Sequence, residues 1–206
     1  MSARDRILGR IRRVATGDDI VWQGGGATPA IARTSGADRV ERFIAQATAA
    51  DATVTRLDGL ADLPAALAEE LRNRNLPAAI RHGAEPDFAA LDWGGVEASQ
   101  GMGRIDEPAT LSKARCAMAE TGTLVLTSGP DNPVTLTFLG ETHFVVVEAD
   151  RIEAGFEGVF ADLRAAGSSP RTVNMVTGPS RSADIGQVLQ LGAHGPIALH
   201  IFVLGA

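Results

Sequence analysis

The sequence contains one cysteine, Cys116, and one lysine, Lys113, among its 206 residues. A single thiol cannot form an internal disulfide. It also cannot supply the cysteine ligands of a zinc site or of an iron–sulfur cluster held by this chain alone. We therefore expect a protein that holds no cofactor, neither an iron–sulfur cluster nor a flavin. Schiff-base chemistry, which needs a lysine amine, would have one candidate residue.

Long apolar runs are also missing. No run reaches the roughly 18 residues that a membrane-spanning helix needs, and residues 1–13 are charged throughout and lack the apolar core of a signal peptide. Basic residues number 19 and acidic residues 25, which gives a net charge of −6. This balance argues against nucleic acid or an anionic membrane as the main partner. We expect a cytoplasmic protein that does not insert into membranes.

The length fits one domain with a short extension, because domains average roughly 100–200 residues. Residues 3–14 carry apolar side chains at helical spacing in an arginine-rich segment, which predicts a helix. A stretch containing Gly24–Gly26 follows and is typical of an extended arm. We therefore divide the chain into residues 1–35, a helix and a glycine-rich arm, and residues 36–206, an α/β domain.

From residue 36 onward, strand patterns alternate with helix patterns. Helices are predicted over residues 38–50, 64–73, 86–91 and 156–166, a brief helix over 110–116, a short strand near 96–99, and strands near 52–57, 78–81, 124–127, 144–147, 173–177 and 198–204. Such alternation predicts an α/β fold with a mainly parallel, open sheet. The apolar run Phe144–Val147 is the strongest strand pattern of the middle region, and we expect it to be buried.

The C-terminal stretch 172–204 has the pattern of a strand, a helix and a second strand, which together would form a βαβ unit. We expect the helix to begin near Ser182 and to end at Gly192. Asp184 would lie in its first turn, where a negative charge suits the helix dipole.

Two loops would flank this helix. The first contains Gly178, Pro179 and Ser180, and it would follow the carboxyl end of a strand, where open α/β sheets bind ligands. The second, residues 193–196, would precede a strand and lie on the opposite face unless the chain doubles back.

A second dense motif, Ala119–Thr123, precedes the strand at 124–127. Its glycine would let the backbone approach a ligand closely, and its hydroxyl and amide groups would donate to an anion. Glu120 would act as an acid, a base or a nucleophile if it lay near that ligand. The alternative is structural, with Glu120 capping a neighbouring backbone group and the threonines bonding within the turn.

The histidines give no clear metal pattern. A three-histidine site would require members of the set His82, His143, His194 and His200 to converge, and their spacing does not demand it, so we predict no metal site. His200 falls within a central strand, as a core histidine would. His194 lies in a loop beside Gly195 and is the better functional candidate.

Three short segments, taken in order, resemble a known family. They are Ala-Glu-Thr-Gly-Thr-Leu-Val-Leu at 119–126, Gly-Pro-Ser-Arg-Ser-Ala-Asp-Ile at 178–185 and Gly-Ala-His-Gly-Pro at 192–196. The chain resembles the LUD-domain family, of the lactate utilisation protein C type, over residues 36–204. It departs from the family pattern at Gly186, where glutamate is usual, and at Thr137–Gly140, where a Leu-Leu-Pro run is usual.

The resemblance implies a fold like that of ribose-phosphate isomerase, glucosamine-phosphate deaminase and the CoA transferases. It also implies a non-redox accessory role beside iron–sulfur proteins in a system that oxidises L-lactate to pyruvate. In that role the chain would bind a small anionic ligand or a partner subunit. Whether the chain is itself an enzyme is left open.

Two alternatives stay open beside this role. One is a free-standing enzyme that acts on a phosphorylated sugar or a CoA thioester, for which Arg104, Arg115 and Arg181 would be the candidate phosphate-binding residues. The other is a structural domain with a vestigial pocket.

The matched motif positions supply the candidate site residues. Glu120 is the catalytic candidate, and the ligand-binding candidates are Thr121, Gly122, Thr123, Gly178, Pro179, Ser180, Asp184, His194 and Gly195. We expect Glu120–Thr123 and Gly178–Ser180 to line one pocket. Amides and hydroxyls would hold a carboxylate or phosphate there, and Glu120 would move a proton or orient the ligand.

Overall fold

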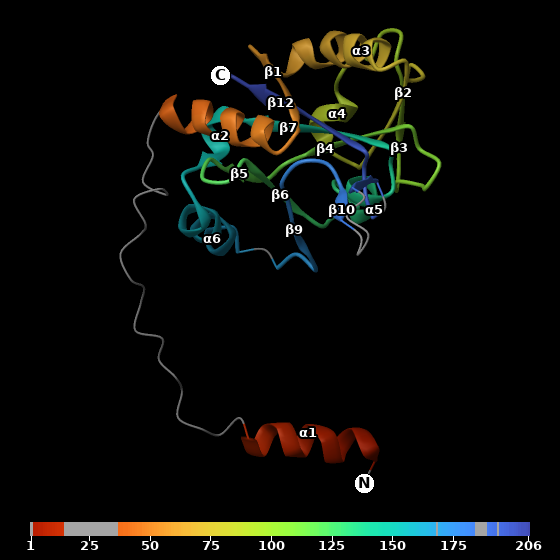
Figure 1. Ribbon diagram of the computed structural model, residues 1–206. Helices are drawn as coiled ribbons and strands as arrows, with labels where there is room; N and C mark the ends of the chain where they lie inside the picture. Colours follow the sequence, from red (N-terminus) through yellow and green to blue (C-terminus); the bar gives the residue numbers. More distant parts are fainter. Residues whose placement is uncertain (1, 15–36, 168, 184–188, 193) are drawn as a thin grey trace.

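The computed structural model describes residues 2–14, 37–167, 169–183, 189–192 and 194–206. At its centre lies a sheet of six parallel strands in the order β1-β12-β7-β4-β2-β3 (Figure 1). The strands are β1 (Thr53–Leu57), β2 (Ala79–His82), β3 (Glu97–Gln100), β4 (Ala109–Lys113), β7 (Thr142–Glu148) and β12 (Ala198–Leu204). Phe144–Val147 is fully buried in β7. The predicted α/β fold with a mainly parallel sheet is confirmed.

Five of the predicted helices are present close to their expected bounds. They are α1 (Ala3–Val14), α2 (Ala37–Ala49), α3 (Leu63–Asn73), α4 (Pro86–Ala89) and α6 (Phe156–Ala165), with short 3-10 turns η2 (Leu60–Asp62) and η3 (Ala149–Arg151). In the ranges that the structure describes, no helix has the length and apolar content that crossing a bilayer requires.

One face of the central sheet is covered by α3 and α4 (Figure 1). Pro64 occupies the first turn of α3, where its missing N–H costs nothing. Leu67 and Leu71 recur at helical spacing and are buried together with Phe144 and Phe202 of the sheet. Each side chain of this size contributes roughly 1.5–3 kcal/mol by leaving water, so this layer fixes α3 across β7 and β12.

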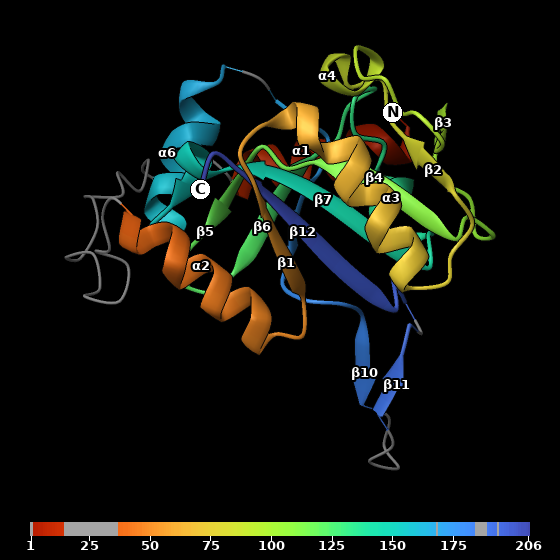
Figure 2. The same cartoon turned by 90° about the horizontal axis from the view of Figure 1, so that it is seen from above.

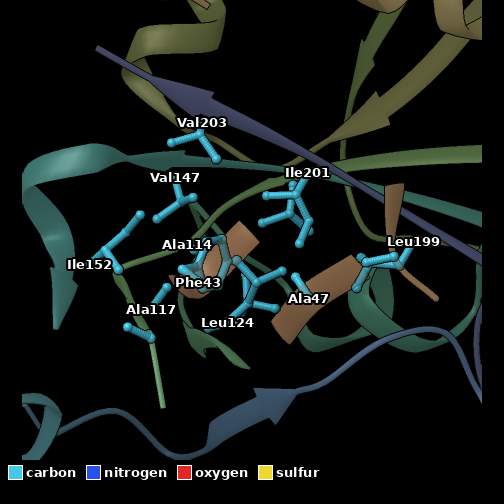
Figure 3. Packing of buried hydrophobic residues seen from close by; sticks show 14 residues of the cluster. Phe43, Ala47, Ala114, Ala117, Leu124, Val147, Ile152, Leu199, Ile201 and Val203 are labelled. Carbon is cyan, nitrogen blue, oxygen red and sulfur yellow. The ribbon is translucent and has the colours of Figure 1, made fainter. Parts of the chain in front are cut away.

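The opposite face is covered by α2 and by a second, four-stranded sheet of order β8-β5-β6-β9. Its strands are β8 (Ile152–Glu153), β5 (Cys116–Met118), β6 (Thr123–Thr127) and β9 (Val173–Val176). Figure 3 shows Phe43 and Ala47 of α2 packed with Leu124 of β6 and Ile201 of β12. On the outer side of the second sheet, Val159 of α6 completes a smaller apolar cluster.

The helix expected between Ser182 and Gly192 is wrong. The chain there forms an antiparallel hairpin of β10 (Arg181–Ala183) and β11 (Leu189–Leu191), which projects from the body (Figure 2). The expected βαβ unit is also wrong, because β9 pairs with β6 in the second sheet and not with β12. The base of the hairpin is closed by backbone bonds, since Ser180 N donates to Pro196 O at 2.8 Å and Gly192 N donates to Ser180 O at 3.1 Å.

Two further predictions in the middle region need correction. Residues 110–116, expected as a brief helix, form most of β4 and the start of β5, because Thr110 and Ser112 find hydrogen-bond partners inside the core and tolerate a buried strand. The strand at 124–127 exists as β6, but it lies antiparallel in the second sheet. A short helix that the sequence did not suggest, α5 (Val134–Phe138), follows the turn at residues 129–133.

Two glycines fasten the loops of this second layer to the end of α2. Gly122 and Gly178 have φ angles of +67° and +72°, a region that favours glycine. A Cβ added to Gly122 would overlap the backbone N of Ala47, and one added to Gly178 would overlap the carbonyl O of Ala50. Both motif glycines therefore make close backbone contacts within the protein.

We predict that Gly178→Ala lowers the free energy of unfolding by about 2–4 kcal/mol, because it combines an unfavourable φ with an overlap against backbone atoms that cannot rotate away. Gly95→Ala is the matched control, since an added Cβ there meets no atom within 4 Å. That change should stay within about 0.5 kcal/mol of the wild type in urea unfolding. Equal midpoints for the two variants would contradict the packing role of Gly178.

Candidate functional site

A cavity of about 200 Å³ lies where two loops meet beside the amino ends of β7 and β12. One loop, Thr177–Ser180, follows β9, and the other, His194–Pro196, precedes β12. His143 and Leu199, which are register partners on β7 and β12, form part of its wall. We call this cavity the loop pocket. Its remaining lining residues are Thr137, Phe138, Met175 and Val176.

The structure brings both C-terminal motifs to this cavity. Gly178, Pro179 and Ser180 line it together with His194 and Gly195. The chain does double back here, because the β10–β11 hairpin returns it to the edge where β9 ends. Asp184, the other candidate of this stretch, lies outside the described residues.

The Glu120–Thr123 motif does not line the loop pocket but is connected to it. The hydroxyl of Thr123 lies 2.6 Å from that of Thr121 and 2.5 Å from that of Thr177. This row of hydroxyls ends on the residue that precedes Gly178. Gly122 packs against α2 and does not face a cavity.

Glu120 is half-buried, and its backbone N donates to Ala154 O at 3.0 Å. Its carboxylate makes no hydrogen bond or ion pair with any residue that the structure describes. The capping role considered from the sequence therefore finds no partner for this side chain. Glu120 is available to a ligand or a partner chain, and its catalytic role stays a prediction.

The most informative residue of the loop pocket is His143. The side chain is fully buried, and burial lowers the pKa of its imidazole to about 3, so the ring is neutral. Its Nε2 lies 3.0 Å from Ser112 Oγ, whereas its Nδ1 has no partner in the described part of the chain. If Ser112 donates its hydroxyl hydrogen, Nδ1 carries the ring hydrogen and is a free donor.

A second buried polar atom without a partner belongs to the same cavity. Thr137 is 1% exposed, and its Oγ1 has no hydrogen bond with a described residue. Buried polar atoms in native proteins are nearly always paired, because an unpaired one costs about 1–3 kcal/mol. His143 Nδ1 and Thr137 Oγ1 both belong to residues that line the loop pocket, so a molecule in this cavity could complete their hydrogen bonds.

The remaining walls determine what this ligand resembles. Among the described residues, no Asp, Glu, Lys or Arg side chain lines the loop pocket, and Phe138, Met175 and Leu199 supply apolar surface. Polar contacts would come from neutral hydroxyl and imidazole groups. The arrangement fits a small molecule with one apolar side and one polar group that accepts hydrogen bonds.

Sequence reasoning missed both of these buried residues as ligand contacts. His143 was considered only as a metal ligand, and Thr137 only as a departure from a family pattern. The available signal was a histidine inside an otherwise apolar strand, Phe144–Val147, because such a residue must find a partner. Across the described ranges, no group of three or more His, Cys, Asp or Glu side chains is placed to hold a metal ion.

Cys116 and His200 are core residues. Burial raises the pKa of the Cys116 thiol to about 11, so this thiol is not a nucleophile near neutral pH. His200 is 1% exposed, and its Nδ1 lies 2.7 Å from Thr53 Oγ1. Burial, with help from Arg74, lowers its pKa to about 3.

Comparison with known proteins identifies the family. Residues 40–204 match the LUD domain. The chain belongs to the LUD-domain family. The match covers all of the strands described above and both loops of the pocket.

Among sequence relatives, an uncharacterized protein of Neisseria meningitidis serogroup B is 33% identical over 150 residues, which is 68% of this chain and 64% of that protein. A protein named lactate utilization protein C from Geobacillus sp. is 33% identical over 84 residues, 39% of this chain and 35% of that protein. The protein of the same name from Bacillus licheniformis is 30% identical over 111 residues, 52% of this chain and 46% of that protein. The chain thus spans between about a third and two thirds of the length of these relatives.

A solved structure shares the fold. The crystal structure of a DUF162 family protein from Deinococcus radiodurans, at 1.70 Å resolution, superposes with a TM-score of 0.61. The superposition covers 84% of this chain and 99% of that chain, at 24% sequence identity. This likeness supports the arrangement of strands and helices.

The buried neutral state of His143 predicts a pH effect on stability. In the unfolded chain a histidine titrates near 6.5, so between pH 6.5 and about 3 the unfolded state binds a proton that the folded state does not. Stability is fully present above pH 6.5 and falls as the pH drops, by about 2 kcal/mol at pH 5.0 for this residue. We expect the free energy of unfolding, measured with urea, to fall between pH 7.5 and 5.0 in both proteins. The fall should be about 2 kcal/mol smaller in His143→Gln than in the wild type. Identical losses would mean that His143 is not held neutral.

Proposed function

We propose that this chain serves lactate utilisation as a component without a redox cofactor of its own, and that its loop pocket binds a small organic anion. The names of the relatives from Geobacillus sp. and Bacillus licheniformis support the pathway. The observation that carries the ligand proposal is the pair of unpartnered buried atoms, His143 Nδ1 and Thr137 Oγ1, on one cavity.

A short carboxylic acid matches these groups. Its carboxylate would accept from the imidazole N–H of His143 and from the hydroxyl of Thr137, while Ser180 and His194 lie on the same cavity and offer further donors. A methyl group would lie against Leu199 or Met175. Lactate and pyruvate combine these two features in a molecule small enough for a cavity of about 200 Å³.

The alternative of a phosphorylated substrate receives less support at this site. Of the three arginines considered for phosphate binding, none lines the loop pocket, and Arg181 forms an ion pair with Asp51. A doubly charged phosphate would meet no lysine or arginine among the described lining residues, and its burial costs more than that of a singly charged carboxylate. The iron–sulfur proteins expected from the family resemblance remain the proposed partners of this chain.

Thr137→Val tests the ligand proposal sharply. The change keeps the shape of the side chain and removes a buried hydroxyl that has no partner, so the free energy of unfolding should stay equal or rise. Binding of L-lactate or pyruvate, measured by titration calorimetry, should weaken about fivefold or more because one hydrogen bond is lost. Unchanged or higher stability together with weaker binding would show that the Thr137 hydroxyl serves ligand binding and not folding.

The matched control is Thr55→Val, because Thr55 lies on β1 away from the cavity. This variant should bind as the wild type does. If Thr137→Val bound both acids with unchanged affinity, or if the wild type bound neither, the proposed carboxylate site would be wrong.

Glu120 and Ser180 test the two motifs in the cell. Neither side chain makes a hydrogen bond within the described residues. The free energies of unfolding of Glu120→Gln and Ser180→Ala should therefore lie within about 0.5 kcal/mol of the wild-type value. We expect both to slow growth on L-lactate when they replace the wild-type gene, with growth on glucose unaffected. Variants that melt early and show no separate growth defect would assign the motifs to the scaffold.

A further inference from the structure

A second cavity, of about 240 Å³, lies at the opposite edge of the central sheet, beside the carboxyl ends of β4 and β7. We call it the edge cavity. Its polar lining includes Glu85, Lys113, Arg115, Asp131, Asn132 and Glu148. It shares no lining residue with the loop pocket, and the proposed function above makes no use of it.

The position of the edge cavity follows from the topology. β2 and β4 are neighbours in the sheet. After β2 the chain passes through α4, whose Phe88 packs on the face covered by α3, whereas after β4 it passes through β5, whose Ala117 packs on the other face. The connection after β2 and the connection after β4 therefore leave the sheet toward opposite faces. A crevice remains between them at the carboxyl ends of these two strands. Open α/β sheets bind their ligands at such a crevice.

The cations that line the edge cavity are already paired with carboxylates. Lys113 Nζ contacts Asp87 Oδ2 at 2.6 Å and Glu148 Oε1 at 2.7 Å. Burial by itself would lower the pKa of this amine, but the two carboxylates outweigh burial and raise it, so the amine stays charged. Arg115 and Arg151 both pair with the single carboxylate of Asp162, each through one nitrogen within 2.7 Å.

The lining carboxylates and cations of the edge cavity are equal in number. Lys113, Arg115 and Arg151 face Glu85, Asp131 and Glu148, while Asp87 and Asp162 pair with these cations from outside the lining. Glu85 and Asp131 have no ion-pair partner among the described residues. Burial, with the nearby Asp87 and Asp131 charges, raises the pKa of Glu85. The cavity thus carries spare hydrogen-bond acceptors, and its lining residues give no excess of either charge.

Asn132 provides an independent indication of a ligand. It is 4% exposed, it lines the edge cavity, and its Nδ2 donates to Thr127 O at 3.3 Å. This bond fixes the orientation of the amide, because the reversed amide would set two carbonyl oxygens against each other. The Oδ1 atom is then a buried acceptor without a partner in the described chain. It requires a donor, which a ligand in the cavity would supply.

We propose that the edge cavity binds an uncharged, polyhydroxylated small molecule. Its hydroxyl hydrogens would be donated to Asn132 Oδ1 and to the carboxylates of Glu85 and Asp131. Its hydroxyl oxygens would accept from the free guanidinium nitrogens of Arg115 at the rim. A phosphate or carboxylate ligand is disfavoured because Lys113, Arg115 and Arg151 already pair with carboxylates, and a diamine is disfavoured because Lys113 already occupies the cationic position.

The test is a titration of ¹⁵N-labelled full-length protein followed by NMR. Xylitol and meso-erythritol are the uncharged probes, sodium phosphate is the anionic probe and putrescine is the cationic probe. We expect saturable shifts with the polyols at the amides of Glu85, Asp87, residues 113–115 and residues 131–132, and no shift at Thr177, Gly178 and Ser180. Phosphate or putrescine should produce no saturable shift at those amides.

Two variants and one control locate the site. Asn132→Leu and Glu85→Ala should each weaken xylitol binding at least fivefold, since each removes an acceptor. Asp92→Asn, an exposed carboxylate near α4 that lies outside the cavity, should bind as the wild type does. If Asn132→Leu fails to fold, Glu85→Ala decides. Saturable binding of phosphate or putrescine in place of the polyols, polyol shifts insensitive to Glu85→Ala, or no polyol shifts at all would each overturn the proposal.

Discussion

The burial of β7 and β12 between two apolar layers is the constraint on which the rest of the structure depends. Six of the seven residues of β7 are buried, so its side chains alternate between the α3 side and the α2 side without reaching water. Any polar group placed in these strands must find a partner inside the protein. His200 pairs with Thr53 and His143 pairs with Ser112, each through one ring nitrogen, and the second nitrogen of each ring has no partner among the described residues. Of these two histidines, His143 is the one that lines the loop pocket.

Close packing against α2 explains why the two glycine motifs matter although only one of them lines the cavity. Ala47 and Ala50 present bare backbone at the end of α2, and Gly122 and Gly178 lie directly on it. This contact fixes where β6 begins and where β9 ends relative to α2. The hydroxyl of Thr123 then meets that of Thr177, and the loop that follows is placed over His143. The Glu120–Thr123 motif therefore contacts the loop at Thr177 and does not itself line the loop pocket.

Much of the fold was accessible from the sequence because the apolar periodicity and the packing agree. The apolar run Phe144–Val147 fits only a buried strand, and the apolar spacing over 38–50 fits only a helix. These patterns were therefore enough to predict both elements. The helix predicted over the stretch 181–191 is wrong although its apolar residues have helical spacing. Backbone hydrogen bonds from Ser180 N to Pro196 O and from Gly192 N to Ser180 O favour the hairpin, and a sequence does not show such bonds. In the site, the loops at 178–180 and 194–195 could be named from their residue types. The roles of His143 and Thr137 depend on unpaired atoms, which only a three-dimensional arrangement reveals.

The two edges of one sheet carry different chemistry for a physical reason. At the amino ends of β7 and β12, the covering loops have backbone groups that are already hydrogen-bonded, as between Ser180 and Pro196. The polar side chains that line the loop pocket there are hydroxyl and imidazole groups. At the carboxyl edge, β4 and β7 end on charged residues, Lys113 and Glu148, which leave the core and pair at its border. Charges at such a border are partly hydrated and tolerate imperfect pairing, whereas a neutral imidazole under an apolar roof does not. The same sheet therefore carries a largely apolar cavity at the amino ends of its strands and a multiply charged cavity at the carboxyl ends. A molecule that suits one cavity is poorly matched to the other.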